Sequence, residues 1–176
     1  TEAGLSHTGS IYFNEPVVHD PEMSQFLRLA FHHLHQSDNR LLRETLLYSA
    51  LLKLMQRHGS EHRDIAEPKQ AKHNIALVRS FLADHPAEDV SLNDLSELSG
   101  LSAYHLVKQF KKRYGLPPHA YQIQCRIRLA KKLIAQGFSL IDTALKSGFH
   151  DQSHFNRHFK RALGIPPGQF AKQIRS

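Results

Sequence analysis

An internal duplication constrains this chain more than any other feature of its sequence. Residues 139–170 read SLIDTALKSGFHDQSHFNRHFKRALGIPPGQF, and residues 91–121 read SLNDLSELSGLSAYHLVKQFKKRYGLPPHAY. Each copy begins with Ser-x-x-Asp, has a glycine after nine or so residues, and closes on Gly-x-Pro-Pro before an aromatic residue. Ser-x-x-Asp resembles a helix capping box, and glycine is typical of a tight turn with positive φ. Each copy therefore predicts a helix-turn-helix, and a repeated one is a stronger signal than either copy alone.

The second helix of the later copy has two chemically different faces. It is expected to run from about Asp151 to Leu163. Apolar residues recur every four positions on the side that would face a core, at Phe155, Phe159 and Leu163. The opposite side carries hydrogen-bonding and cationic side chains, namely Gln152, Ser153, Asn156, Arg157 and Lys160. Because such side chains can bond base edges and phosphates, this face predicts a contact with nucleic acid.

The charge of the chain is concentrated in the half that holds the duplication. Residues 1–68 contain 6 Lys/Arg and 9 Asp/Glu, a net charge of −3, whereas residues 69–176 contain 17 and 7, a net charge of +10. A basic half that coincides with a helix-turn-helix pair is the electrostatic pattern expected of a nucleic-acid-binding domain.

Several other classes of protein are disfavoured by composition. No apolar run approaches the roughly 20 residues that cross a bilayer, and residues 1–16 lack the basic start and apolar run of a signal peptide. Cys125 is the only cysteine, so an intramolecular disulfide is excluded, and its helical surroundings indicate an ordinary helix residue. A cytoplasmic location fits these observations.

The later copy carries a family signature. Its run Gly-Phe-His-Asp-Gln-Ser-His-Phe-Asn-Arg-His-Phe-Lys at 148–160, followed by Gly164-Ile-Pro-Pro, resembles that of AraC/XylS-type bacterial transcription regulators. The resemblance covers roughly residues 74–174 and is looser in the earlier copy. It implies an all-α domain in which two helix-turn-helix units, joined by a long helix, read adjacent major grooves of double-stranded DNA. RNA polymerase is a further candidate partner.

The resemblance also implies specific contact residues. Carried over residue by residue, the base contacts of the first recognition helix fall on Ala103, Tyr104, Val107 and Lys108. Those of the second fall on Gln152, Ser153, His154 and Arg157. Phosphate contacts are expected from Ser102, Lys111, Lys112, Arg113, Lys160 and Arg161. Val107 can make only apolar contacts, so it departs from family members that have a longer polar residue there. Protonation of His154 near neutral pH would strengthen DNA binding as pH falls.

A helix is predicted between the two units, over about 118–136, with Gly137 ending it. About 18 residues at about 1.5 Å each make a strut of roughly 27 Å. This is comparable to the spacing of roughly 34 Å between successive major-groove faces on one side of B-DNA. Four cations on this helix either contact phosphates or are solvated: Arg126, Arg128, Lys131 and Lys132.

Two helices are predicted ahead of the basic half. They form an antiparallel hairpin from Pro21 to His58, with a turn near Asn39. Both have broad apolar stripes, which two helices alone cannot bury, so a third surface is implied: a missing sensor domain, a second protomer in a homodimer, or the DNA-binding domain.

The predicted domain organisation has three parts. Residues 1–58 are the remnant of an N-terminal regulatory domain, 59–71 are a polar linker, and 72–176 are the double helix-turn-helix domain. By resemblance, the β-like residues 10–13 lie where a sensor barrel would end, so we expect a fragment that lacks most of its sensor. A short natural leader is the alternative. A small-molecule effector would then bind outside this chain.

Histidine clusters do not predict a metal site. On one helix, His33 points about 100° away from His32 and His35. His150, His154 and His158 repeat every four residues, but the outer two lie about 12 Å apart on a straight helix, too far for one tetrahedral ion. A two-histidine site shared with another chain is left open, and no metal or cofactor is expected.

Enzymatic activity is not expected either. The sequence has no glycine-rich phosphate loop, no nucleophile elbow and no His-Glu-x-x-His motif. A recombinase would also carry a helix-turn-helix, but nothing here supplies its nucleophile. The alternative functions are a helix-turn-helix protein-interaction module and a nonspecific DNA anchor. The salt dependence of DNA binding distinguishes the protein-interaction module from a DNA-binding protein, because a module without phosphate contacts would show no such dependence.

Overall fold

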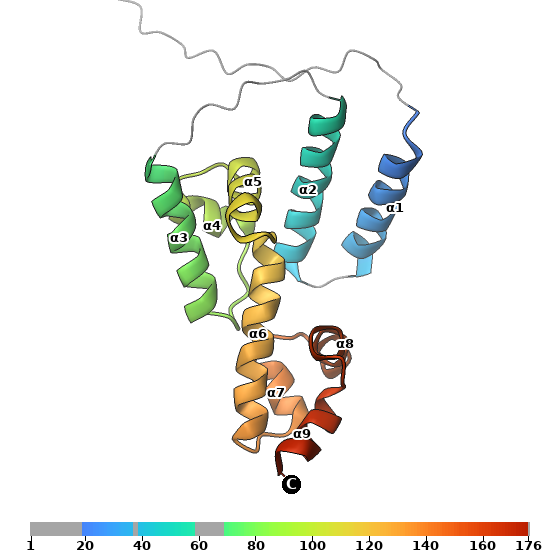
Figure 1. Ribbon diagram of the computed structural model, residues 1–176, viewed down its shortest axis with the longest axis vertical. Helices are drawn as coiled ribbons and strands as arrows, with labels where there is room; N and C mark the ends of the chain where they lie inside the picture. The colour runs from blue at the N-terminus through green and yellow to red at the C-terminus, as the bar shows by residue number, and fades with distance from the viewer. Residues whose placement is uncertain (1–18, 37–38, 59–68, 176) are drawn as a thin grey trace, which may run out of the picture.

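The computed structural model describes residues 19–36, 39–58 and 69–175, where all regular secondary structure is helical (Figure 1). The helices are α1 Pro21–Gln36, α2 Arg40–His58, α3 Lys69–Asp84, α4 Leu92–Ser99, α5 Ala103–Tyr114, α6 Pro118–Ala135, α7 Leu140–Lys146, α8 Gln152–Leu163 and α9 Pro167–Arg175. The all-α fold class is thus confirmed. The β-like residues 10–13 lie outside the described residues, and α3 begins at Lys69, inside the predicted linker.

The two predicted helix-turn-helix units are α4–α5, the first unit, and α7–α8, the second unit. At the start of α4, the Ser91 hydroxyl accepts from the Asp94 amide at 3.1 Å, and the Asp94 carboxylate accepts from the Ser91 amide at 2.8 Å. At the start of α7, the Ser139 hydroxyl accepts from the Asp142 amide at 3.0 Å. These bonds satisfy amides that have no partner inside the helix, which explains why the helices begin there.

Gly148, at the turn of the second unit, is required for two reasons. Its φ is +82°, and a Cβ atom there would lie 2.6 Å from both the Cα and the carbonyl oxygen of Ala87. Gly100, at the turn of the first unit, has a φ of +63° but nothing within 4 Å of a Cβ atom. Because Ala87 lies in the segment between α3 and α4, this close approach joins the second unit to the first.

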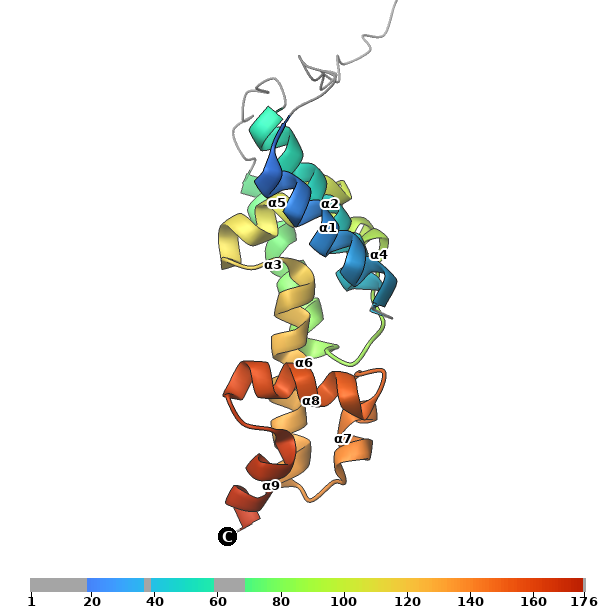
Figure 2. The ribbon, with the colours of Figure 1, turned by 90° about the vertical axis from the view of Figure 1, so that its right-hand side faces the viewer.

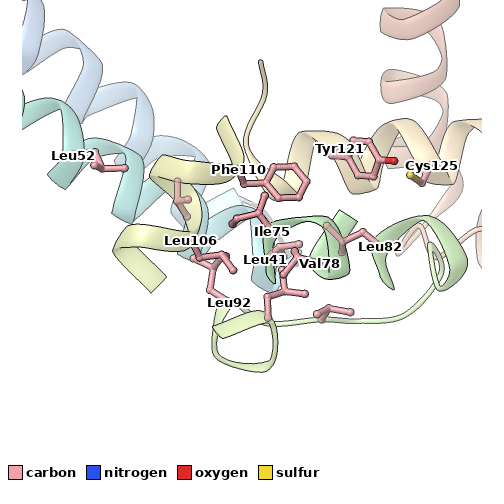
Figure 3. Packing of buried hydrophobic residues seen from close by; sticks show 13 residues of the cluster. Leu41, Leu52, Ile75, Val78, Leu82, Leu92, Leu106, Phe110, Tyr121 and Cys125 are labelled. Carbon is pink, nitrogen blue, oxygen red and sulfur yellow. The ribbon is translucent and has the colours of Figure 1, made fainter. Parts of the chain in front are cut away.

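Helix α6 belongs to the hydrophobic cores of both units. Its first half contributes Tyr121 and Cys125 to a cluster with α2, α3, α4 and α5, part of which Figure 3 shows. Its second half contributes Ile127, Ala130 and Ile134 to a cluster with α7 and α8. The predicted strut between the units is therefore also the element on which both are packed.

Arg126 lies where the two cores meet, and the expectation that it contacts phosphate or is solvated is wrong. Its side chain points inward and is 4% exposed. Its Nε donates to the Pro86 carbonyl at 2.8 Å, and a terminal nitrogen donates to the Glu88 carbonyl at 2.9 Å. The Gln122 amide donates to the same Glu88 carbonyl at 2.9 Å. Loop carbonyls thus replace water as the hydrogen-bond partners of the buried guanidinium. The other three cations of the helix are exposed: Arg128, Lys131 and Lys132.

The predicted hairpin of α1 and α2 packs on the first unit. Two residues of α2, Leu41 and Leu52, belong to the same buried cluster as α5. A carboxylate oxygen of Glu44 on α2 accepts from the Leu92 amide at the start of α4. The DNA-binding domain, one of the three surfaces that could cover the apolar stripes, thus packs against α2. No helix within the described ranges is long and apolar enough to cross a membrane.

Alanine substitution at the two turn glycines should separate backbone strain from steric overlap. We expect Gly100→Ala to lower the free energy of unfolding by about 1–2 kcal/mol, because only its positive φ is penalised. Gly148→Ala should cost about 1–3 kcal/mol more, because its Cβ also overlaps the Ala87 backbone. Urea unfolding followed by circular dichroism measures both. Equal losses would contradict the close approach.

Candidate nucleic-acid interface

The two recognition helices, α5 and α8, begin with equivalent caps. The Ser102 hydroxyl accepts from the His105 amide at 3.4 Å, and the Asp151 carboxylate accepts from the His154 amide at 2.7 Å. Each helix ends at a glycine with positive φ. The caps place the two helices in a common register, so positions can be compared by counting from Ser102 and Asp151.

This register pairs Val107, a predicted base contact, with a residue of α8 that is outside the predicted set of base contacts. Val107 lies five positions after Ser102, and its counterpart five positions after Asp151 is Asn156. Asn156 is half-buried, and its Oδ1 atom is buried without a hydrogen-bond partner among the described residues. The repeat itself carries the signal, because aligning the copies from their caps pairs these two positions.

Helix α8 presents an uncovered polar face. The side chains predicted to contact bases are exposed at Gln152, Ser153 and Arg157 and half-buried at His154. The predicted phosphate contacts Lys160 and Arg161 are exposed one turn later. Figure 2 shows α8 crossing in front of α6 with no other helix over it. The structure therefore brings these predicted residues together on one accessible helix face.

His154 and His158 are packed on Phe149 rather than fully solvated. Their ring centroids lie 5.5 Å and 6.0 Å from that of Phe149, and 4.5 Å from each other. Burial lowers the pKa of His154 below its ordinary 6.5, and nearby Arg157 lowers it further. Protonation near neutral pH is therefore not expected, and any strengthening of DNA binding by the imidazolium shifts to more acidic conditions.

The face of α5 that corresponds to the open face of α8 is covered by α2. Val107 is 0% exposed and lies in the buried cluster that includes Leu41 and Leu52 of α2. Ala103, Tyr104 and Lys108 are half-buried. Val107 is therefore not presented to solvent in this conformation, contrary to the sequence-based expectation. The expected phosphate contacts of the first unit are exposed at Ser102, Lys111, Lys112 and Arg113.

The turn of the hairpin reaches toward the second unit. Asn39 at that turn, Asp89 in the loop before α4, Arg126 on α6 and His154 on α8 contribute to the lining of one hollow of about 250 Å³. The hairpin thus extends beside the first unit and ends near the start of α8. No group of three or more His, Cys, Asp or Glu in the described part of the chain could hold a metal ion.

Comparisons with known proteins agree with this geometry. The model of a family described as "Helix-turn-helix domain" matches residues 95–173. The chain is 39% identical over 143 residues to the uncharacterized HTH-type transcriptional regulator YbfI of Bacillus subtilis, covering 81% of this chain and 52% of YbfI. It is 38% identical over 97 residues to the HTH-type transcriptional activator AarP of Providencia stuartii, covering 54% of this chain and 72% of AarP.

A solved structure has the same fold over the basic half. It is that of a probable AraC family transcriptional regulator from Rhodopseudomonas palustris CGA009, with a TM-score of 0.56 and 22% identity over 59% of this chain and 99% of that chain. The chain belongs to the AraC family of helix-turn-helix transcriptional regulators. It spans about half the length of YbfI, with which it shares 39% identity.

Stability should depend on pH through two half-buried imidazoles, those of His158 on α8 and His119 on α6. Burial lowers the pKa of His158 from 6.5 to about 4, helped by neighbouring His154, Arg157, Arg161 and His119. Since the unfolded chain takes up this proton first, stability falls as pH drops from about 6.5 to about 4. We expect His158→Gln to reduce that fall by about 1–2 kcal/mol, after allowance for partial solvent exposure.

Urea midpoints measured at several pH values between 7.5 and 4.5 test this dependence. His150→Gln, which removes an exposed imidazole just before α8, is the matched control. A residual slope is expected in the His158 variant, because burial also lowers the pKa of His119 to about 4. Identical slopes for both variants would show that His158 is not held neutral by the fold.

Proposed function

We propose that this chain binds double-stranded DNA sequence-specifically and that α8 is its principal reading element. The observation that carries this proposal is the exposed polar face of α8, fixed in register by the Asp151 cap. Gln152 suits an adenine edge and Arg157 a guanine edge, each worth about 1–3 kcal/mol of discrimination. Ser153 and Asn156 add shorter hydrogen-bonding groups beside them.

Phosphate contacts flank this face in the proposed complex. Lys160 and Arg161 lie one turn beyond Arg157, where α8 would leave the groove. In the first unit, the corresponding cations are Lys111, Lys112 and Arg113 in the last turn of α5. Such contacts fix orientation and make affinity depend on salt without selecting sequence.

The rest of the proposed activity belongs to the longer proteins of the family. We infer that a small-molecule effector binds a sensor domain outside this chain and that RNA polymerase is a partner at promoters. The hairpin from Pro21 to His58 is a candidate dimerisation or sensor-packing element, because large apolar side chains are exposed on it. They are Leu29, Phe31, Leu47 and Leu51. We assign the chain no catalytic role and a cytoplasmic location.

Selection of DNA sites from a random pool tests base reading directly. We expect the wild-type chain to select a sequence motif from the pool. Arg157→Ala should weaken the binding free energy by about 1–3 kcal/mol and remove the base preference at one position of that motif. Lys111→Ala should weaken all sequences about equally and reduce the salt dependence, because it removes a phosphate contact.

The two substitutions control for each other, since both remove one exposed cation from a recognition helix. Identical effects across randomised sites would contradict the assignment of base and phosphate roles. Recovery of no motif, with uniform salt-sensitive binding, would favour a nonspecific DNA anchor. Absence of any salt-dependent binding would favour a protein-interaction module.

A further inference from the structure

The apolar outer face of α5 is occupied by α2, whereas the matching face of α8 is polar and open. Counting from the caps, Ala103, Tyr104 and Val107 of α5 correspond to Gln152, Ser153 and Asn156 of α8. The three polar side chains suit base edges, but the three of α5 offer one hydroxyl group and otherwise carbon. An apolar helix face of this kind suits another amphipathic helix better than a groove of DNA.

One stripe of α2 provides that partner. Four residues follow the spacing of a single helix face: Leu41, Thr45, Tyr48 and Leu52. Leu41 and Leu52 belong to the cluster that buries Val107, and the half-buried Tyr48 packs against it. Near the start of α2, a carboxylate oxygen of Glu44 accepts a hydrogen bond from the Leu92 amide. The Arg40 guanidinium forms an ion pair with the same carboxylate at 2.9 Å.

The packing of α2 includes an imperfection that limits its strength. Thr45 is 0% exposed, and its hydroxyl oxygen has no hydrogen-bond partner within the described part of the chain. A buried hydroxyl without a partner costs about 1–3 kcal/mol. An interface with such a cost is suited to a contact that must be released, since DNA need supply less free energy to displace it.

The hairpin also stands on the side of the molecule from which DNA would approach. In Figure 1, α1, α2 and α8 all lie to the right of α6, and Figure 2 looks onto that side. There the hairpin lies in front of part of α5, while α8 is uncovered. A straight duplex laid along both recognition helices would therefore meet α1 and α2 before it reached α5.

We propose that the α1–α2 hairpin is an intramolecular cap on the first recognition helix, so that the hairpin and DNA compete for the same face of α5. In the capped state the chain reads bases through the second unit alone, while the exposed Lys111 at the end of α5 can still contact phosphate. Undocking the hairpin exposes Val107, Tyr104 and Ala103 and lets the first unit enter a neighbouring major groove. This inference rests on the proposed DNA-binding function and adds a regulated change in the length of DNA that is read.

Hydroxyl-radical footprinting on a selected duplex tests the cap with a matched pair of variants. Leu52→Asp places a charge in the buried contact with the first unit, and Gln56→Asp places the same charge at an exposed position one turn later on α2. We expect the wild type and Gln56→Asp to protect one element. Leu52→Asp should protect a second element about 10 base pairs away and bind at least about tenfold more tightly.

Thiol labelling in the absence of DNA gives a readout that does not require the proposed function. Val107→Cys should react at least about tenfold more slowly than Ser153→Cys on the exposed face of α8. Adding Leu52→Asp to Val107→Cys should remove most of that difference. The native Cys125 is buried and serves as the internal control, because its labelling would report unfolding rather than undocking. If Leu52→Asp exposes Cys125, Glu44→Ala provides a milder undocking variant with the same expected result.

The outcomes distinguish failure of the cap from failure of DNA binding. A thiol at position 107 that labels as fast as one at 153 in the otherwise native chain would overturn the cap. So would a fully protected thiol in a folded, undocked variant, or a wild-type footprint already as long as that of Leu52→Asp. Loss of all footprints with the labelling pattern intact would support the cap and overturn the proposed function instead.

Discussion

The structure depends on one helix that serves two cores. The first half of α6 is packed in the first unit and its second half in the second unit, so neither recognition helix can rotate independently without disturbing α6. Where the cores meet, the buried guanidinium of Arg126 bonds carbonyls at positions 86 and 88. The same loop approaches the second unit so closely that only glycine fits at position 148. A polar clamp and a steric contact thus fix the relative orientation of the two units.

On this common frame, the two copies of the motif present different surfaces. The core positions agree closely, since Leu106 and Phe110 in α5 and Phe155 and Phe159 in α8 are all 0% exposed. The outer positions diverge, and the divergence coincides with what each helix meets: α5 meets the apolar stripe of α2, whereas α8 is open. We infer that the duplication preserves geometry while the DNA-reading face of one copy stays open and that of the other is controlled by the hairpin.

Local signals predicted much of the fold. The capping pairs and turn glycines located the helices to within a few residues, because caps and positive φ are decided by neighbours in sequence. Periodicity could not predict that Arg126 turns inward or that Val107 is buried, because both depend on segments distant in sequence. A helix pattern assigns Arg126 to a basic surface, and only the loop carbonyls at 86 and 88 make its burial tolerable. The lowered pKa of His154 likewise follows from burial and from nearby Arg157. The equivalence of Asn156 and Val107, by contrast, follows from counting along the sequence from the caps.

Amide hydrogen exchange of the wild-type chain, alone and with a selected duplex that carries two elements, tests the account most directly. Exchange in α8 should slow on binding, because DNA covers a face that is already open. Exchange in α2 and α5 should stay as it is in the free chain, because the docked hairpin keeps DNA away from α5. Slowing of both α5 and α8 with α2 unchanged would contradict the account, since both recognition helices would then bind DNA with the hairpin in place.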